Sequence, residues 1–276
     1  MSSTPSNGYL SPGVAGTGAI ALGVAAVSST LGEVRVLARS DASAWKAEES
    51  AVKLCSKLEG GDPKNVKVTT EAGDLAGCDL VVEAIVEDAD AKVELLSMLG
   101  EACPDADLAT TTSSLSVGDL GERSGAPERF FGLHVFNPVT RMELIELCLP
   151  DGLREGAAER ARAFCAALGK HAVEVPDHTG FVVNRLLFPY LFEAVRLMED
   201  LDLSAKDVDD CMAMGTGQPM GPLKLLDFVG IDVAVAIGES LHEANGHDHH
   251  HPPKLLLQME SEGKLGRKSG EGFYSY

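Results

Sequence analysis

Positively charged residues are scarce in this chain. Its 276 residues include 23 lysines and arginines against 42 aspartates and glutamates, which gives a formal net charge of −19 at pH 7. A surface this acidic repels the phosphates of nucleic acids and of anionic lipid headgroups. We therefore expect neither nucleic acid nor a membrane as a partner, and any phosphate-bearing ligand needs a locally basic pocket.

Paired-cysteine motifs and long apolar runs are also lacking. The 6 cysteines show no Cys-x-x-Cys spacing, which in a chain of this size favours reduced thiols over a disulfide framework. Residues 13–27 are apolar, but this run is too short to span a bilayer, contains several glycines and follows no lysine or arginine. We expect a cytoplasmic protein without a targeting segment.

Short apolar runs alternate with helical patterns over the first two thirds of the chain. The β-branched runs predict strands at residues 34–38, 66–69, 80–85, 108–112, 130–135, 144–148 and 172–175. Alternation of this kind is typical of βαβ units and a parallel sheet. A helix is expected at residues 151–168, because Gly169 follows it as a stop signal.

The pattern becomes purely helical from Pro176 onward. Helices are expected at residues 181–201, 204–214, 223–229 and 231–243. This change predicts an α/β chain of two domains: a doubly wound sheet domain over residues 1–177, followed by an all-helical domain over residues 178–276.

A glycine-rich turn stands between the first expected strand and the helix after it. Gly16, Gly18 and Ala21 fit the G-x-G-x-x-G/A pattern. Its first glycine allows a tight turn, its second lets a pyrophosphate approach the backbone, and the phosphates meet N–H groups at the helix start. The pattern predicts a Rossmann-type dinucleotide site. Pro12 lies where the first strand should run, so that strand either starts at Gly13 or is distorted at its beginning.

The residues after the second expected strand bear on the choice of cofactor. Folds of this type hold the ribose 2′-hydroxyl of NAD with an Asp or Glu there, whereas this chain has Ala38, Arg39 and Ser40. An arginine can pair with a 2′-phosphate, and the missing carboxylate removes a repulsion against it. The pattern favours NADP over NAD. The alternative is a solvated Arg39, with the ribose bound by Asp41.

A histidine with polar neighbours supplies the chemistry expected of an oxidoreductase. Asn137 and Glu146 follow His134 by three and twelve residues, and Asn184 belongs to a second stretch, residues 180–186. A histidine, a supporting carboxylate and neutral hydrogen-bonding groups can remove a proton from a substrate hydroxyl. Taken singly, each has a structural interpretation: His134 as a half-buried histidine, Glu146 as a solvated strand residue, and Ser113 as a helix cap.

Several motifs in a fixed order add a resemblance to a known family. They are residues 82–87 with Lys92, 111–114, 132–138, Glu146, 180–187, 219–222 and 265–274. With the glycine turn, these motifs resemble the L-3-hydroxyacyl-CoA dehydrogenases, which include the 3-hydroxybutyryl-CoA enzymes, over almost the whole chain. The resemblance implies reversible hydride transfer between NAD(P) and C3 of a short acyl thioester, and a homodimer formed through the helical domain.

The resemblance also implies roles for the polar residues. His134 would be the general base or acid, with Glu146 orienting the imidazole and stabilising its protonated form. Ser113 and Asn184 would hydrogen-bond the substrate oxygen and fix its angle to the nicotinamide. Asn137, placed with the substrate-side residues, is expected to hold its loop.

Ligand contacts are implied in the same way. Glu87 and Lys92 match family positions near the cofactor's ribose and nicotinamide. Ser50 and Lys57 are similar to the family's CoA-contacting serine and lysine. The segment before Val66 is shorter than in many relatives, and few cations are available to hold CoA phosphates. The acyl group could therefore arrive on CoA or on the phosphopantetheine arm of a carrier protein.

The sequence leaves room for three other interpretations. The histidine-rich residues 247–251 suggest a metal site, but adjacent imidazoles cannot all face one ion, so no metal is expected. A 3-hydroxyacid dehydrogenase acting on free acids would use a lysine such as Lys170 or Lys224, although neither has the glycine-rich context of that class. A non-catalytic dinucleotide-binding protein is the remaining alternative, since fold alone does not exclude it.

Overall fold

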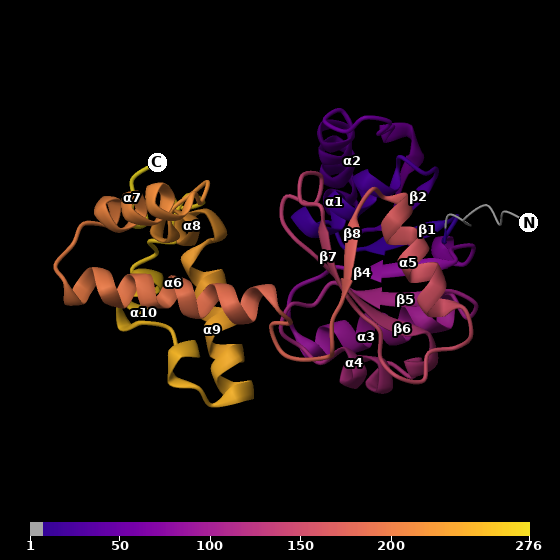
Figure 1. Ribbon diagram of the computed structural model, residues 1–276. Helices are drawn as coiled ribbons and strands as arrows, with labels where there is room; N and C mark the ends of the chain where they lie inside the picture. Colours follow the sequence, from indigo (N-terminus) through magenta and orange to yellow (C-terminus); the bar gives the residue numbers. More distant parts are fainter. Residues whose placement is uncertain (1–7) are drawn as a thin grey trace, which may run out of the picture. The chain divides into compact units, whose positions relative to one another are not determined.

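The computed structural model describes residues 8–276 as two compact units, the first ending at His178 and the second starting at Thr179 (Figure 1). The first unit contains an eight-stranded sheet in the order β3-β2-β1-β4-β5-β6-β7-β8. Its strands are β1 (Pro12–Ala15), β2 (Val34–Leu37), β3 (Val66–Thr69), β4 (Leu80–Glu83), β5 (Asp107–Thr110), β6 (Phe130–Val135), β7 (Leu144–Cys148) and β8 (His171–Glu174). Neighbouring strands run parallel except β6 and β7, which are antiparallel. The order reverses between β1 and β4, which confirms the doubly wound fold.

The central strands are buried on both faces, which explains their continuous apolar character. Every residue of β1, β4, β5 and β6 is buried, whereas the edge strands β3 and β8 are largely exposed or partly exposed. Strand β1 begins at Pro12, one residue earlier than expected, and Pro12 pairs with Leu80 of β4. A proline is tolerated there because it is the first residue of the strand.

Helices connect these strands: α1 (Ala19–Ser28), α2 (Asp41–Cys55), α3 (Ala89–Ala102), α4 (Val117–Arg123) and α5 (Ala157–Ala167), with 3-10 turns at Pro63–Asn65, Ala72–Leu75 and Pro127–Arg129. The side chains of Ser40, Asp88 and Ser116 accept hydrogen bonds from the first turns of α2, α3 and α4, and so cap them. On one face of the sheet, α1 and α5 pack apolar side chains such as Leu22 and Phe164 against the central strands.

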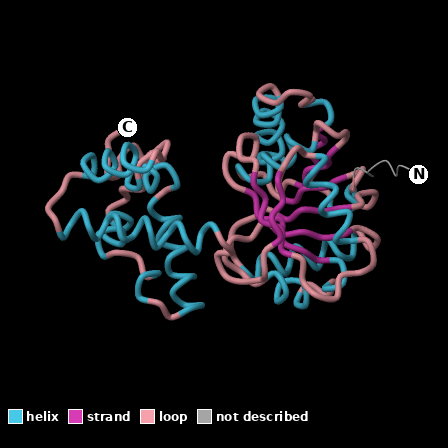
Figure 2. The backbone as a smooth tube through the Cα atoms, in the orientation of Figure 1, coloured by secondary structure: helices cyan, strands magenta, loops and turns pink. Residues whose placement is uncertain are grey.

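The second unit is helical: α6 (Val183–Asp200), α7 (Ala205–Thr216), α8 (Pro222–Val229), α9 (Ile231–Asn245) and α10 (Lys254–Ser261), with a 3-10 turn at Asp248–His250. Figure 2 shows helices and loops here, and no strand lies within residues 179–276. The unit has its own apolar core, which includes Phe192, Leu226 and Leu241. No helix in residues 8–276 is both long and apolar enough to cross a membrane.

Candidate active site

The glycine turn joins β1 to α1, and its first glycine has no room for a side chain. Gly16 has a φ of +128°, and a Cβ atom there would lie 2.4 Å from the carbonyl oxygen of Ala84. Gly18 precedes the first residue of α1, and a Cβ atom on it would meet nothing within 4 Å. Ala21 is fully buried beneath the turn. The open space at Gly18, in front of the helix N–H groups, fits a dinucleotide pyrophosphate.

The residues after β2 are those expected to determine whether NAD or NADP binds. Ala38 is buried, whereas Arg39 is exposed and has no hydrogen-bond or ion-pair partner among residues 8–276. The Ser40 hydroxyl accepts a hydrogen bond from the Ser43 backbone N–H at 3.3 Å and so caps α2. Arg39 can therefore reach a ligand without breaking a contact, while Ser40 already has a structural role.

His134 and Glu146 form a buried pair across the β6–β7 hairpin. The two residues are direct partners in the antiparallel register, and His134 Nδ1 lies 2.7 Å from Glu146 Oε2. His134 is 5 % exposed and Glu146 is 1 % exposed, so Glu146 is not a solvated strand residue. The Phe136 ring packs edge-on against the imidazole, with 4.6 Å between ring centres. A carboxylate held this close to the imidazole fixes the orientation of the ring.

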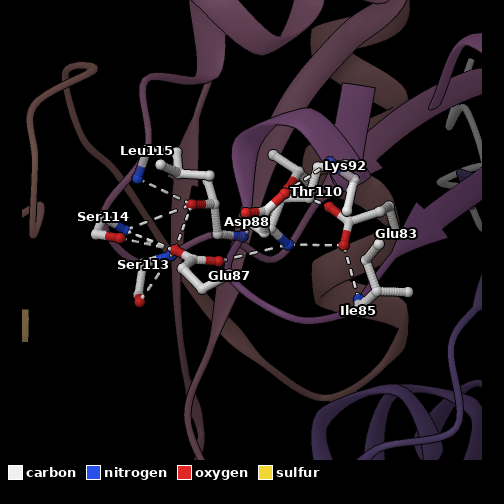
Figure 3. A network of polar contacts seen from close by, with 11 residues as sticks. Glu83, Ile85, Glu87, Asp88, Lys92, Thr110, Ser113, Ser114 and Leu115 are labelled. Carbon is white, nitrogen blue, oxygen red and sulfur yellow. Dashed lines mark hydrogen bonds and ion pairs between the residues drawn. The ribbon is translucent and has the colours of Figure 1, made fainter. Parts of the chain in front are cut away.

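Glu87 is the hub of a polar network at the ends of β4 and β5 (Figure 3). Its Oε1 atom accepts hydrogen bonds from the backbone N–H groups of Ser113 at 2.8 Å and Ser114 at 3.0 Å, and from the Thr112 hydroxyl at 2.6 Å. Its Oε2 atom lies 3.4 Å from the Lys92 Nζ atom. Burial acts to raise the pKa of Glu87, but the Lys92 charge and these hydrogen bonds outweigh it and hold the pKa below its ordinary value. An anionic Glu87 therefore fixes the backbone at Ser113.

Two further residues of this network, Glu83 and Thr110, were not predicted from the sequence. Glu83, the last residue of β4, is fully buried and lies 2.7 Å from the Lys92 Nζ atom. The hydroxyl of Thr110, at the end of β5, donates to Glu83 at 2.7 Å. The only available signal was an acidic residue at the end of an otherwise apolar strand, since such a residue must find a partner when it is buried.

The remaining predicted residues take part in none of the contacts described above. Asn137 is exposed two residues after the end of β6, and Asn184 is buried in α6 of the helical unit. Ser50 lies within α2, and Lys57 lies two residues beyond the end of that helix. Neither Ser50 nor Lys57 forms a hydrogen bond or ion pair with another predicted site residue in the described part of the chain.

The histidine-rich segment shows ring packing. His249 contacts His250 with 4.4 Å between ring centres, and His247 stacks on His249 at 5.2 Å. Within residues 8–276, no group of three or more histidine, cysteine, aspartate or glutamate side chains could hold a metal ion.

The fold and this site together define a class of enzyme. A doubly wound sheet, an open glycine turn at a helix start and a buried His134–Glu146 pair are the parts of a dinucleotide-dependent dehydrogenase. Two family models specify the class further: the 3-hydroxyacyl-CoA dehydrogenase NAD binding domain matches residues 12–178, and the C-terminal domain of that family matches residues 180–276. The chain belongs to the 3-hydroxyacyl-CoA dehydrogenase family, and it is an oxidoreductase with a nicotinamide dinucleotide as cofactor.

Individual relatives resemble the chain over nearly its whole length. It is 38% identical over 278 residues to a 3-hydroxybutyryl-CoA dehydrogenase of Mycobacterium tuberculosis, covering 96% of this chain and 97% of that protein. It is 39% identical over 282 residues to the human mitochondrial hydroxyacyl-coenzyme A dehydrogenase, covering 95% and 90%. The crystal structure of M. tuberculosis FadB2 matches with a TM-score of 0.92 and 38% identity, covering 97% of this chain and 99% of that one.

Proposed function

We propose that this enzyme transfers a hydride reversibly between NADP or NAD and C3 of a short-chain 3-hydroxyacyl or 3-oxoacyl thioester of CoA. His134 is the base that takes the C3-hydroxyl proton, or the acid that returns it. The observation that carries the proposal is the buried contact of 2.7 Å between His134 Nδ1 and Glu146 Oε2. Relatives named 3-hydroxybutyryl-CoA dehydrogenase and hydroxyacyl-coenzyme A dehydrogenase support the substrate class.

The chain's own residues account for the movement of the proton. When bound, the nicotinamide supplies or accepts the hydride. Glu146 holds the Nδ1 atom of His134, so the proton is exchanged with the C3 hydroxyl through Nε2. As the imidazole gains this proton, the buried carboxylate stabilises the new charge. Ser113, whose backbone Glu87 holds, hydrogen-bonds the C3 oxygen and fixes its angle.

Replacing His134 with Gln tests this assignment. With acetoacetyl-CoA as substrate, we expect His134→Gln to lower kcat by about 10²–10⁴-fold, because general base catalysis contributes that much. The dissociation constant of the reduced cofactor is expected to stay within about twofold of the parent value, since the glycine turn is untouched. The matched control is His171→Gln, at an exposed histidine of β8, which is expected to keep the parent kcat. Cofactor absorbance at 340 nm gives the rates.

The outcomes separate the alternatives. A kcat near the parent value in His134→Gln would contradict the mechanism. Activity only on carrier-bound acetoacetate would identify a carrier protein as the thiol, and activity only on free 3-hydroxybutyrate would identify a 3-hydroxyacid dehydrogenase. One observation counts against a 3-hydroxyacid dehydrogenase that uses Lys170. The Lys170 ammonium donates hydrogen bonds to the carbonyl oxygens of Val139 at 2.6 Å and Met142 at 2.8 Å, so it is bound to the β6–β7 loop.

We propose that the enzyme uses NADP in preference to NAD and that it is located in the cytoplasm. Exposed Arg39, with no carboxylate at the end of β2, supports recognition of a 2′-phosphate. All six cysteines are free thiols, and five of them are buried, which supports a reducing compartment.

A further inference from the structure

A closed ring of polar contacts joins the ends of β4 and β5 to α3 (Figure 3). Lys92 of α3 contacts Glu83 at 2.7 Å and Glu87 at 3.4 Å. On the other side, the Thr110 hydroxyl donates to Glu83 at 2.7 Å and accepts from the Thr112 backbone N–H at 3.2 Å. The Thr112 hydroxyl then donates to Glu87 at 2.6 Å, which completes the ring. Two chains of contacts therefore connect Glu83 to Glu87 and the Ser113 turn. One runs through the Lys92 ammonium, and the other runs through Thr110 and Thr112.

The ring has a buried half and an exposed half. The side chains of Glu83 and Lys92 are 0% and 1% exposed, and Thr110 is fully buried, whereas the Glu87 side chain is 35% exposed. Both carboxylate oxygens of Glu83 have donors: Oε1 accepts from Lys92 and from the Ile85 backbone N–H, and Oε2 accepts from Thr110. A buried carboxylate with this many partners is held in one position, and it fixes the groups that bind it.

We propose that Glu83 is a positioning residue, whose buried charge holds the Lys92 ammonium and thereby sets Glu87 and the Ser113 turn for the cofactor and substrate. The inference deepens the proposed function and rests on it, because it takes Glu87 and Lys92 to lie near the ribose and nicotinamide of the cofactor, as the family resemblance implies. Lys92 forms its ion pairs with Glu83 and Glu87 in the described residues. Without the negative charge of Glu83, the ammonium has Glu87 as its remaining anionic partner and moves toward it.

Charge, rather than shape, is the property of Glu83 that matters in this proposal. A glutamine at position 83 has nearly the same shape and can still accept the hydrogen bond from Thr110. It cannot hold an ammonium by charge. Glu83→Gln therefore changes the electrostatic route through Lys92 while it largely retains the hydrogen-bond route through Thr110.

The experiment is a double-mutant cycle with Glu83→Gln, Lys92→Met and the combined variant. The dissociation constant of the reduced cofactor is measured by fluorescence titration, because it requires no knowledge of the substrate. Each single substitution is expected to raise the dissociation constant about tenfold. The combined variant is expected to bind the cofactor no more weakly than Lys92→Met alone, because Glu83 acts through Lys92. Additive effects in the combined variant would show that Glu83 does not act through Lys92, which would overturn the proposal.

Two further variants guard against loss of folding. Asp107→Asn is the matched control: Asp107 is a fully buried carboxylate at the other end of β5, held by Tyr9, Arg154 and Arg160, and outside the ring. It is expected to lower the melting temperature and to leave the cofactor constant within about twofold. If Glu83→Gln does not fold, Glu83→Asp serves instead, because it keeps the negative charge but is one methylene shorter, which withdraws the carboxylate from the Lys92 ammonium. It is expected to weaken cofactor binding about threefold, and an unchanged constant would overturn the proposal.

Cofactor binding tests the role of Glu83, whereas reduction of acetoacetyl-CoA tests the proposed function. If the parent enzyme reduces acetoacetyl-CoA but Glu83→Gln binds the cofactor as the parent does, only the role of Glu83 is wrong. If the parent binds the cofactor but reduces no acyl thioester, the proposed function is wrong, and the cofactor cycle still decides the role of Glu83.

Discussion

At the scale of single residues, Arg39 is expected to decide which cofactor binds. Its exposed guanidinium can pair with a 2′-phosphate, which NADPH has and NADH lacks. We expect Arg39→Ala to raise the dissociation constant of NADPH about tenfold and to leave that of NADH within about twofold. The control is Arg35→Ala on β2, whose guanidinium donates to the Asp74 carbonyl oxygen. Fluorescence titration of the parent and both variants with NADPH and NADH measures the six dissociation constants, and tighter binding of NADH by the parent would show instead that Arg39 is solvated.

The residues of the site differ in how well the sequence predicts them. His134 and Glu146 lie twelve residues apart, a spacing that a hairpin turns into a direct contact, and the structure places them 2.7 Å apart. Glu83 and Thr110 could not be predicted as partners, because 27 residues separate them and an acidic residue at a strand end is equally compatible with solvent. Their contact depends on the parallel pairing of β4 with β5, which no local pattern encodes.

At the scale of elements, α1 lies close to the loop between β6 and β7. A Cβ atom on Gly23, inside α1, would lie 2.7 Å from the Cβ atom of Val139, which is 3% exposed. Gly23→Ala is expected to cost about 1–3 kcal/mol of unfolding free energy, because the overpacking outweighs the better helix propensity of alanine. Denaturant unfolding measures the change.

The same substitution at Gly215 is the control for Gly23→Ala. Gly215 lies inside α7, and a Cβ atom there would meet nothing within 4 Å. Gly215→Ala is therefore expected to gain about 0.5–1 kcal/mol from helix propensity alone. Equal gains at both positions would show that Val139 moves aside without cost.

The elements follow the sequence closely where apolar periodicity is strong. The expected strands at residues 66–69, 130–135 and 144–148 agree with β3, β6 and β7 at both ends. The helix expected at residues 151–168 begins instead at Ala157, because Gly152 and Gly156 adopt φ values of +89° and +77° that interrupt a right-handed helix. Gly23 is tolerated inside α1, whereas Gly152 and Gly156 delay the start of α5. Only the backbone conformation distinguishes the two cases.

At the scale of the whole molecule, exposed apolar surface is concentrated in the helical unit. Of the large apolar side chains that are exposed, nine lie within residues 179–276 and seven within the longer unit of residues 8–178. Those of the helical unit are Val182, Leu186, Leu197, Leu201, Leu203, Met214, Phe228, Val233 and Tyr276. The family resemblance implies a homodimer formed through this domain, and we propose that a second copy of this chain covers part of this apolar surface.

The oligomeric state in solution tests this proposed homodimer. Sedimentation velocity is expected to give twice the chain mass of 29.0 kDa. Leu186 and Met214 are 70% and 79% exposed, so replacing both with glutamate adds buried charge only if a partner covers them. The double variant is expected to sediment as a monomer, whereas Trp45→Glu, at the exposed tryptophan of α2 in the sheet unit, is expected to leave the dimer intact. A parent that sediments as a monomer would contradict the homodimer, and a dimer that survives both glutamates would place its interface elsewhere on the chain.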